Sequence, residues 1–286
     1  MGGGSWTTTA YNCAIKSMGF SDTKSITKSA VQTVYKMRGL ARELDPKGVI
    51  RECRDSDEHP NTIPVILALD VTGSMGNAAK MCAAKLDEIM TELYKSVTDI
   101  EFLMMGIGDL AYDFAPIQAS QFESDIRILD QTTKIFFEAG GGGNSFESYT
   151  AAWYFGLNNT DLDCWKRGKK GIIITLGDEP LNPYLPGKAL SGVLGTNTQD
   201  VDTKTLYNDV IEKFDVYHIA ITDHSSYERY KSAIKDSWGK LLGQHFMKST
   251  SDKLPEVISS IVNDSINSST SSNDSHVMVS DEGISW

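Results

Sequence analysis

The sequence lacks a long hydrophobic run, a leader-like start and closely spaced cysteines. Its longest apolar stretches have the length of single strands, so no transmembrane helix is predicted. The first residues, Met1-Gly-Gly-Gly-Ser-Trp6, carry neither a basic region nor an apolar one, and we expect no secretory leader. The four cysteines form no metal-binding or redox pair: Cys13, Cys53, Cys82 and Cys164. We therefore expect a reduced, cytoplasmic protein.

Basic residues are also scarce. The chain has 27 Lys and Arg against 38 Asp and Glu, which gives a formal net charge of −11. Because phosphate groups are bound by basic surfaces, this balance argues against nucleic-acid and anionic-membrane binding. An acidic surface suits cations and basic partners. The hydrophobic share of 40% is enough for a core in a chain of 286 residues.

Composition divides the chain into three segments. Residues 1–60 have few large apolar side chains and are predicted to form an extension, with one helix over residues 25–40. Residues 61–264 alternate strand and helix patterns and are predicted to form the main domain. Residues 265–286 are rich in Ser and Asn, so we expect a disordered tail.

The pattern within the main domain predicts a doubly wound α/β fold, in which a mostly parallel sheet carries helices on both faces. Helices are expected between the strands, because apolar residues there recur with a 3.6-residue period. The expected strands are residues 64–69, 100–107, 114–117, 171–176, 216–221 and 244–247. The expected helices are residues 75–95, 126–137, 147–157, 203–214, 227–234 and 254–262.

The most informative stretch follows the first of these strands and reads Asp70-Val-Thr72-Gly-Ser74. It places one carboxylate and two hydroxyls at the carboxyl end of a strand, where open α/β sheets bind ligands. Asp178 follows another buried strand, and parallel strands would bring both acids to one edge. Asn144, in the loop 140–148, offers a further oxygen. Such an all-oxygen set suits Mg²⁺, Mn²⁺ or Ca²⁺ and is poor for structural Zn²⁺.

Simpler interpretations exist for several of these residues. Asp, Thr and Ser all cap helices, so the stretch from Asp70 could be a turn with a cap. The glycines at 140–143 lack the spacing of a phosphate-binding loop and are expected to form a turn. We expect Asp109 to be a solvated turn acid and Glu179 to be exposed. His218 lies within a strand and is predicted to be a hydrogen-bonded core residue.

The stretch beginning at Asp70 resembles the Asp-x-Ser/Thr-x-Ser signature of the metal-ion-dependent adhesion site in von Willebrand factor A domains. The resemblance covers residues 61–264 and includes an acid after the fourth strand and a glycine-rich loop before a helix. It implies a doubly wound α/β fold and four metal ligands, direct or through water: Asp70, Thr72, Ser74 and Asp178.

One feature departs from the family. A threonine usually follows the paired glycines, whereas Gly143 is followed here by Asn144. Asn144, Ser145, Glu147 or a water molecule could take the place of that threonine, and the sequence leaves these alternatives open.

The predicted function is a non-enzymatic module that grips an acidic group of a protein partner through a divalent cation. No nucleophile–base pair accompanies the predicted site. Intracellular bacterial and phage members of the family often work beside MoxR-type AAA+ ATPases, so the resemblance implies such a partner. The alternative is a Mg²⁺-dependent phosphoryl-transfer hydrolase with Asp70 as nucleophile. Haloacid-dehalogenase-like phosphatases carry a second Asp two residues on, where this chain has Thr72.

Overall fold

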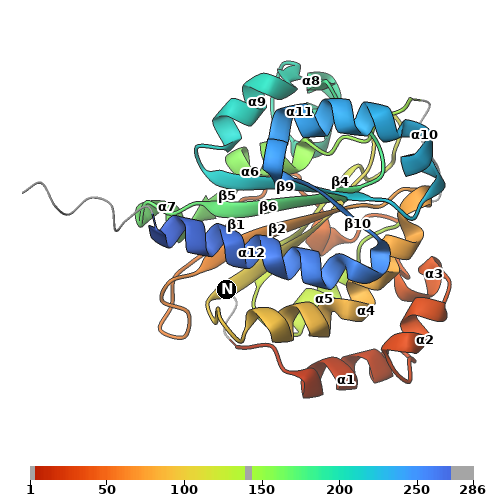
Figure 1. Ribbon diagram of the computed structural model, residues 1–286, viewed down its shortest axis with the longest axis vertical. Helices are drawn as coiled ribbons and strands as arrows, with labels where there is room; N and C mark the ends of the chain where they lie inside the picture. The colour runs from red at the N-terminus through yellow and green to blue at the C-terminus, as the bar shows by residue number, and fades with distance from the viewer. Residues whose placement is uncertain (1–3, 139–143, 272–286) are drawn as a thin grey trace, which may run out of the picture.

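The computed structural model describes residues 4–138 and 144–271, and its centre is a six-stranded sheet with the order β10-β9-β6-β2-β3-β4 (Figure 1). Every neighbouring pair is parallel except β3 and β4, which are antiparallel. The strands are β2 (Ile63–Asp70), β3 (Ile100–Ile107), β4 (Ile117–Glu123), β6 (Gly171–Gly177), β9 (Phe214–Ile221) and β10 (Phe246–Ser249). The chain builds outward from β2 in both directions, which confirms the predicted doubly wound α/β fold.

Helices cover both faces of this sheet (Figure 1). Below it in the figure lie α1 (Thr8–Ser17), α2 (Thr23–Lys28), α3 (Val31–Val34), α4 (Gly76–Leu93), α5 (Arg127–Thr133) and α12 (Leu254–Ser271). Above it lie α6 (Ala151–Asn158), α8 (Gly187–Leu194), α9 (Thr203–Val210), α10 (Ser225–Ile234) and α11 (Lys240–Leu242). A further short helix is α7 (Asp163–Lys166). None of the described helices is long and apolar enough to cross a membrane.

The two faces carry separate hydrophobic cores because side chains alternate along each strand. In β2, Val65, Leu67 and Leu69 pack with the helices of the lower layer. Ile66 and Ala68 pack with those of the upper layer. A strand buried on both faces must be apolar throughout, which is why its sequence shows a continuous hydrophobic run.

Residues 25–40 do not form the single helix that their periodicity predicts. The chain forms α2 and α3 instead, separated by Ser29, whose backbone is extended (φ −77°, ψ 160°). The Ser29 hydroxyl donates to the carbonyl of Ser25 at 2.7 Å, so the side chain occupies a carbonyl within the last turn of α2. Short polar side chains compete with the helical backbone in this way, and the helix ends.

The partner of β3 begins at Ile117 and not at residue 114. Residues 109–116 form a turn closed by bonds from Asp113 N to Asp109 O (2.9 Å) and from Gly108 N to Pro116 O (3.0 Å). The predicted helices at 126–137 and 147–157 are likewise shorter, since α5 ends at Thr133 and α6 begins at Ala151. Turn hydrogen bonds at these ends replace the helical ones that periodicity alone predicts.

The segment before β2 packs against α4. Tyr11 donates its hydroxyl to the carbonyl of Ala84 (2.5 Å), Tyr35 to that of Ala79 (2.7 Å), and the Trp6 indole to Asp87 (2.9 Å). Strand β1 (Arg51–Cys53) pairs in parallel with β5 (Thr160–Leu162). At the other end of the chain, α12 continues past residue 264 to Ser271. The remainder of the predicted tail lies outside the described residues.

Candidate metal centre

Asp70 and Asp178 lie at the same edge of the sheet. Asp70 is the last residue of β2 and Asp178 follows β6 directly, and these two strands are parallel neighbours with Leu69 opposite Leu176. The order in which strands are added to the sheet reverses at this point, since β3 lies on one side of β2 and β6 on the other. Such a switch point leaves a crevice at the carboxyl ends of the strands. Both side chains are fully buried at this edge of the sheet.

The Asp70 carboxylate is held at both oxygens. Its Oδ1 accepts hydrogen bonds from the backbone N–H (2.9 Å) and the hydroxyl (2.7 Å) of Thr72. Its Oδ2 accepts a hydrogen bond from the Tyr149 hydroxyl at 2.7 Å. These three donors fix the orientation of the carboxylate, as the outer partners of metal-binding carboxylates do.

Only one oxygen of the Asp178 carboxylate has a hydrogen-bond partner among the described residues. Its Oδ1 accepts a hydrogen bond from the Ser74 hydroxyl at 3.1 Å, which joins the loop after β2 to the end of β6. Its Oδ2 is buried, has no hydrogen-bond partner among the described residues, and lies 3.5 Å from Nδ1 of His224. A buried carboxylate oxygen without a donor is costly unless a cation accompanies it. This oxygen therefore fits a cation, and the exposed Ser74 beside it leaves the edge open to solvent.

Other acids lie near this pair, and burial together with neighbouring negative charges raises the pKa of Asp70, Glu147 and Glu179. Burial, and after it the charge of Asp178, raise the pKa of the Asp70 carboxyl despite the hydrogen bonds from Thr72. Burial and the charge of Asp70 raise the pKa of the Glu147 carboxyl well above its usual value. Burial and the charges of Asp70 and Asp178 raise that of Glu179 to about 7. An excess of buried negative charge is the environment that a divalent cation stabilises.

Within residues 4–138 and 144–271, no three His, Cys, Asp or Glu side chains converge closely enough to hold a metal ion by themselves. The donors that the structure brings together are two carboxylates and the hydroxyls of Thr72 and Ser74. This all-oxygen set fits Mg²⁺, Mn²⁺ or Ca²⁺, which accept hydroxyls and water alongside carboxylates.

Asn144 is hydrogen-bonded to Asp109, which lies beside that group of oxygen donors. Its side-chain amide donates to Oδ2 of Asp109 at 2.6 Å, and its Oδ1 accepts a hydrogen bond from the backbone of Phe146 at 3.0 Å. In the part of the chain that is described, no hydrogen bond joins Asn144 to Asp70 or Asp178. The glycines at 140–143, with their predicted turn, lie outside the described residues.

Glu147 is the second candidate from the same loop. Its side chain is 3% exposed, and its Oε2 has no hydrogen-bond partner in the structure as described. The charge of Asp70 is the largest influence on its pKa after burial. Glu147 therefore faces the same acidic cluster as Asp70.

Two acids differ from their expected exposure. Asp109 is buried, 4% exposed, because its carboxylate accepts hydrogen bonds from its own loop at Ala111 N (2.8 Å) and from Asn144. Glu179 is half-buried beside the Asp178 carboxylate. The prediction of two solvated acids is wrong, since both belong to the group at this edge of the sheet.

The sequence did not single out Tyr149 or His224. The glycine at position 177 could have indicated that a side chain approaches here, since a Cβ at Gly177 would lie 2.3 Å from the Tyr149 hydroxyl. A glycine ending a buried strand indicates that another group approaches the backbone closely. His224 precedes α10 and reaches Asp178 only through the fold, so no local pattern marks it.

His218 is a core residue, as predicted, but it is only partly hydrogen-bonded. Its Nδ1 lies 2.9 Å from the Thr175 hydroxyl, and its ring stacks on Trp238 with the centroids 3.8 Å apart. Its Nε2 is buried without a hydrogen-bond partner among the described residues. Burial lowers the pKa of His218 to about 3, so the ring is neutral.

No sequence-family model matches the chain, and no curated protein matches it in sequence. Among solved structures it is similar to the pilus adhesin SpaC of Lactobacillus rhamnosus GG, in its open conformation (TM-score 0.49, 12% identity, 78% of this chain and 31% of SpaC). It is also similar to BatB of Bacteroides thetaiotaomicron (TM-score 0.43, 13% identity, 72% and 99%). A third similar structure is the D319A mutant of the PilB minor pilin of Streptococcus sanguinis (TM-score 0.46, 12% identity, 73% and 62%). The chain spans about a third of the length of SpaC, and likenesses of this degree do not identify its family.

Proposed function

We propose that this protein is a non-enzymatic binding module of the von Willebrand factor A type, which grips an acidic partner group through a divalent cation. The observation that carries the proposal is the buried, unpartnered Oδ2 of Asp178 beside the oriented carboxylate of Asp70. The resemblance of the Asp70–Ser74 stretch to a metal-ion-dependent adhesion site supports it.

In this proposal Asp70, Thr72, Ser74 and Asp178 hold Mg²⁺, or Mn²⁺ or Ca²⁺, directly or through water. Tyr149 and the Thr72 backbone keep Asp70 in place. When bound, the cation would act as a Lewis acid that binds a carboxylate of the partner. Six oxygens satisfy Mg²⁺, so four or five from the protein leave room for an oxygen from the partner.

Of the alternatives for the missing threonine (Asn144, Ser145, Glu147 or a water molecule), we propose that the loop at residues 140–148 contributes Asn144 or Glu147. Asn144 needs to leave its bonds to Asp109 and Phe146 to reach the cation. Glu147 already has an unpartnered oxygen and would bring a third negative charge. The two alternatives differ in charge, so Glu147→Gln weakens Mg²⁺ binding strongly only if Glu147 is the ligand, and Asn144→Ala only if Asn144 is.

A hydrolase with Asp70 as nucleophile is the less supported alternative. Both oxygens of Asp70 accept hydrogen bonds, and Thr72 offers no carboxyl group as general acid. Turnover of an aryl phosphate with Mg²⁺, lost in Asp70→Asn, would replace our proposal with this one.

Calorimetric titration of Mg²⁺ and Mn²⁺ into chelator-treated protein tests the metal site. We expect saturable binding in the natural protein and none in Asp178→Asn, which removes the charge that no donor satisfies. Asp57→Asn, at an exposed position, is the matched control and should bind as the natural protein does. Identical flat traces for all three proteins would overturn the proposal.

The partner is proposed to be a protein that presents a carboxylate, a MoxR-type AAA+ ATPase being the candidate that the resemblance suggests. Four free cysteines are compatible with a cytoplasmic location, which we also propose. Capture of such an ATPase from extract in Mg²⁺, its loss in chelator, and its loss with Asp70→Ala are the expected results. Capture that is unaffected by chelator would refute metal dependence.

A further inference from the structure

His224 places a buried imidazole beside the candidate metal centre. Its side chain is 7% exposed, and its Nδ1 lies 3.5 Å from Oδ2 of Asp178. Neither Nδ1 nor Nε2 of the ring has a hydrogen-bond partner among the described residues. An unpaired polar group is costly in a buried position, so the ring is suited to a further ligand.

Helix capping does not account for the histidine at this position. His224 directly precedes α10, where Ser, Thr, Asp and Asn are favoured because their oxygens accept backbone N–H groups, but its side chain makes no such bond. The loop that carries it is fixed from the other side. The Thr222 N–H donates to the carbonyl of Ser249 (2.8 Å), and Asp223 accepts bonds from the N–H (3.1 Å) and hydroxyl (3.0 Å) of Ser251. The fold thus holds the imidazole at the carboxyl edge of the sheet.

The separation of Nδ1 of His224 from Oδ2 of Asp178 is close to that of two ligands of one cation. Two donors that each lie about 2.1 Å from an ion are about 3.0 Å apart at an octahedral angle and about 3.4 Å apart at a tetrahedral one. The observed separation is 3.5 Å, and neither atom has a hydrogen-bond partner among the described residues. The Ser74 hydroxyl, bonded to the other oxygen of Asp178, lies at the same edge. One cation at this edge would satisfy both unpaired atoms.

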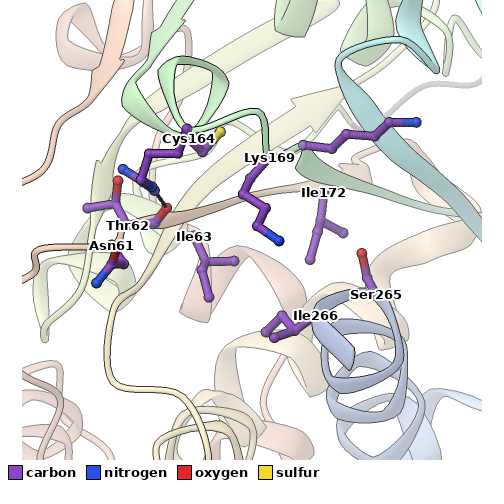
Figure 2. Close-up of a pocket in the computed structure, with 10 residues that line it drawn as sticks. Asn61, Thr62, Ile63, Cys164, Lys169, Ile172, Ser265 and Ile266 are labelled. Atoms are coloured by element: carbon purple, nitrogen blue, oxygen red, sulfur yellow. Dashed lines mark hydrogen bonds between the residues drawn. The ribbon is translucent and has the colours of Figure 1, made fainter. Parts of the chain in front are cut away.

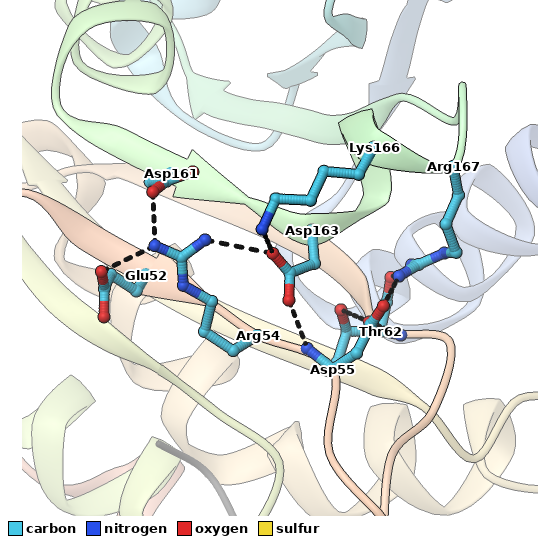
Figure 3. Close-up of polar contacts among 8 residues, drawn as sticks. All are labelled: Glu52, Arg54, Asp55, Thr62, Asp161, Asp163, Lys166 and Arg167. Carbon is cyan, nitrogen blue, oxygen red and sulfur yellow. Dashed lines mark hydrogen bonds and ion pairs between the residues drawn. The ribbon is translucent and has the colours of Figure 1, made fainter.

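Two other polar regions of the described chain lack such an unpaired acid and imidazole. A pocket of about 200 Å³ lies at the amino ends of β2 and β6, where Ile63, Ile172 and Lys169 line it (Figure 2). No acid is among its described lining residues. The acids near β1 and β5 that Figure 3 draws each pair with Arg54 or Arg167. Neither region therefore suits a divalent cation as the edge with Asp178 does.

We propose that His224 is a further ligand of the metal centre and makes it prefer Mn²⁺ and related first-row transition cations over Mg²⁺ and Ca²⁺. This inference rests on the function proposed above. An imidazole nitrogen suits transition cations, whereas Mg²⁺ and Ca²⁺ are bound by oxygen. A ligating imidazole is neutral, so it adds a donor without changing the balance of charge between the cation and the carboxylates of Asp70 and Asp178. The cation therefore still attracts an acidic group of a partner.

Calorimetric titration of Mn²⁺ and of Mg²⁺ into chelator-treated protein tests the preference. In His224→Ala the ratio of Mn²⁺ to Mg²⁺ affinity should fall at least about tenfold, since even outer partners of metal ligands contribute that much. His245→Ala is the matched control and should keep the ratio, because its imidazole lies near the Val216 carbonyl, before β10, and away from this edge. An unchanged ratio in His224→Ala would overturn the inference alone. Binding of neither cation by the natural protein would overturn the metal centre with it.

Pulsed electron paramagnetic resonance of the bound Mn²⁺ distinguishes a ligand from a histidine that only supports Asp178. A nitrogen bonded to Mn²⁺ couples to the electron spin through the bond and modulates the spin echo. We expect ¹⁴N modulation in the natural protein, its replacement by the ¹⁵N pattern after labelling with ¹⁵N-histidine, and its loss in His224→Ala loaded with excess Mn²⁺. Bound Mn²⁺ without histidine modulation, or modulation that persists in His224→Ala, would overturn ligation by His224 and leave the metal centre itself in place.

Discussion

At the scale of single residues, Tyr149 supports the candidate centre through a hydrogen bond from its hydroxyl to Asp70, one of the expected ligands. Tyr149 can approach because Gly177 has no side chain, and its hydroxyl orients the Asp70 carboxylate. The expected metal ligands thus rely on a group outside the signature. Substitution of the phenol should weaken metal binding without removing any ligand.

Tyr149→Phe should weaken Mg²⁺ affinity about tenfold, the lower end of what outer partners of metal ligands contribute. The aromatic contacts of the ring with His218 and Trp238 would remain, so the fold should not change. Calorimetry measures the affinity, and Tyr112→Phe, at an exposed side chain, serves as control. Unchanged affinity would show that the hydrogen bond to Asp70 is not needed.

His218 makes stability depend on pH. The unfolded histidine takes up a proton below about pH 6.5, whereas burial holds the folded pKa at about 3. The unfolded state therefore binds more protons between these values, and His218 lowers the free energy of unfolding as pH falls from 6.5 towards 3. At pH 4.5 the loss is about 2–3 kcal/mol relative to pH 7.5.

His218→Phe should remove this part of the acid sensitivity. The ring can still stack on Trp238, and the Thr175 hydroxyl keeps the Tyr217 carbonyl as acceptor. Urea unfolding of both proteins at pH 7.5 and 4.5 gives the difference between their pH dependences. A difference near zero would mean that His218 is protonated in the folded protein.

At the scale of elements, α4 connects the segment before β2 to the sheet. Trp6, Tyr11 and Tyr35 all donate hydrogen bonds to α4, and Tyr11 and Tyr35 are buried at 0% and 1% exposure. Residues expected to be an extension therefore contribute to the lower hydrophobic core. Their removal should reduce the stability of the sheet domain as well.

Tyr35→Ala should lower the free energy of unfolding by about 3–5 kcal/mol, as for other large buried aromatic side chains. The loss combines a cavity against α4 with the hydrogen bond to Ala79. Chemical denaturation measures it, with Tyr112→Ala as the exposed control. A change below about 1 kcal/mol, the level of ordinary surface substitutions, would show that this segment is not part of the folding unit.

At the scale of the whole molecule, metal binding and folding should be linked. Asp70 and Asp178 come together only when β2 and β6 pair, so the unfolded chain offers no comparable site. A ligand present at 100 times its dissociation constant stabilises the folded state by about 2.7 kcal/mol. Mg²⁺ should therefore stabilise the entire domain.

For a chain of this size, that stabilisation corresponds to a rise in melting temperature of roughly 5–10 °C. Thermal unfolding with Mg²⁺ and with chelator measures the rise, which should disappear in Asp178→Asn. NaCl at matched ionic strength separates specific binding from charge screening. An equal rise with NaCl alone would exclude a specific site.

The sequence by itself determined the fold class and the position of two acids. Buried strands such as β3 read as continuous apolar runs, and an acid that ends β2 and an acid that follows β6 must lie at the edge where parallel strands end. Hydrophobic periodicity is a local property of the sequence, and the direction of the strands follows from simple rules of topology. Together they are enough to predict the fold class and the position of the two acids.

Only the tertiary structure decided which groups surround those acids. Tyr149 meets Asp70 across 79 positions, and His224 approaches Asp178 from the loop after β9. Asn144 bonds to Asp109, a choice that its own loop does not dictate. Hydrogen bonds and burial between distant segments depend on how the layers pack; Gly177 marks a close approach, but its sequence position does not say which residue approaches.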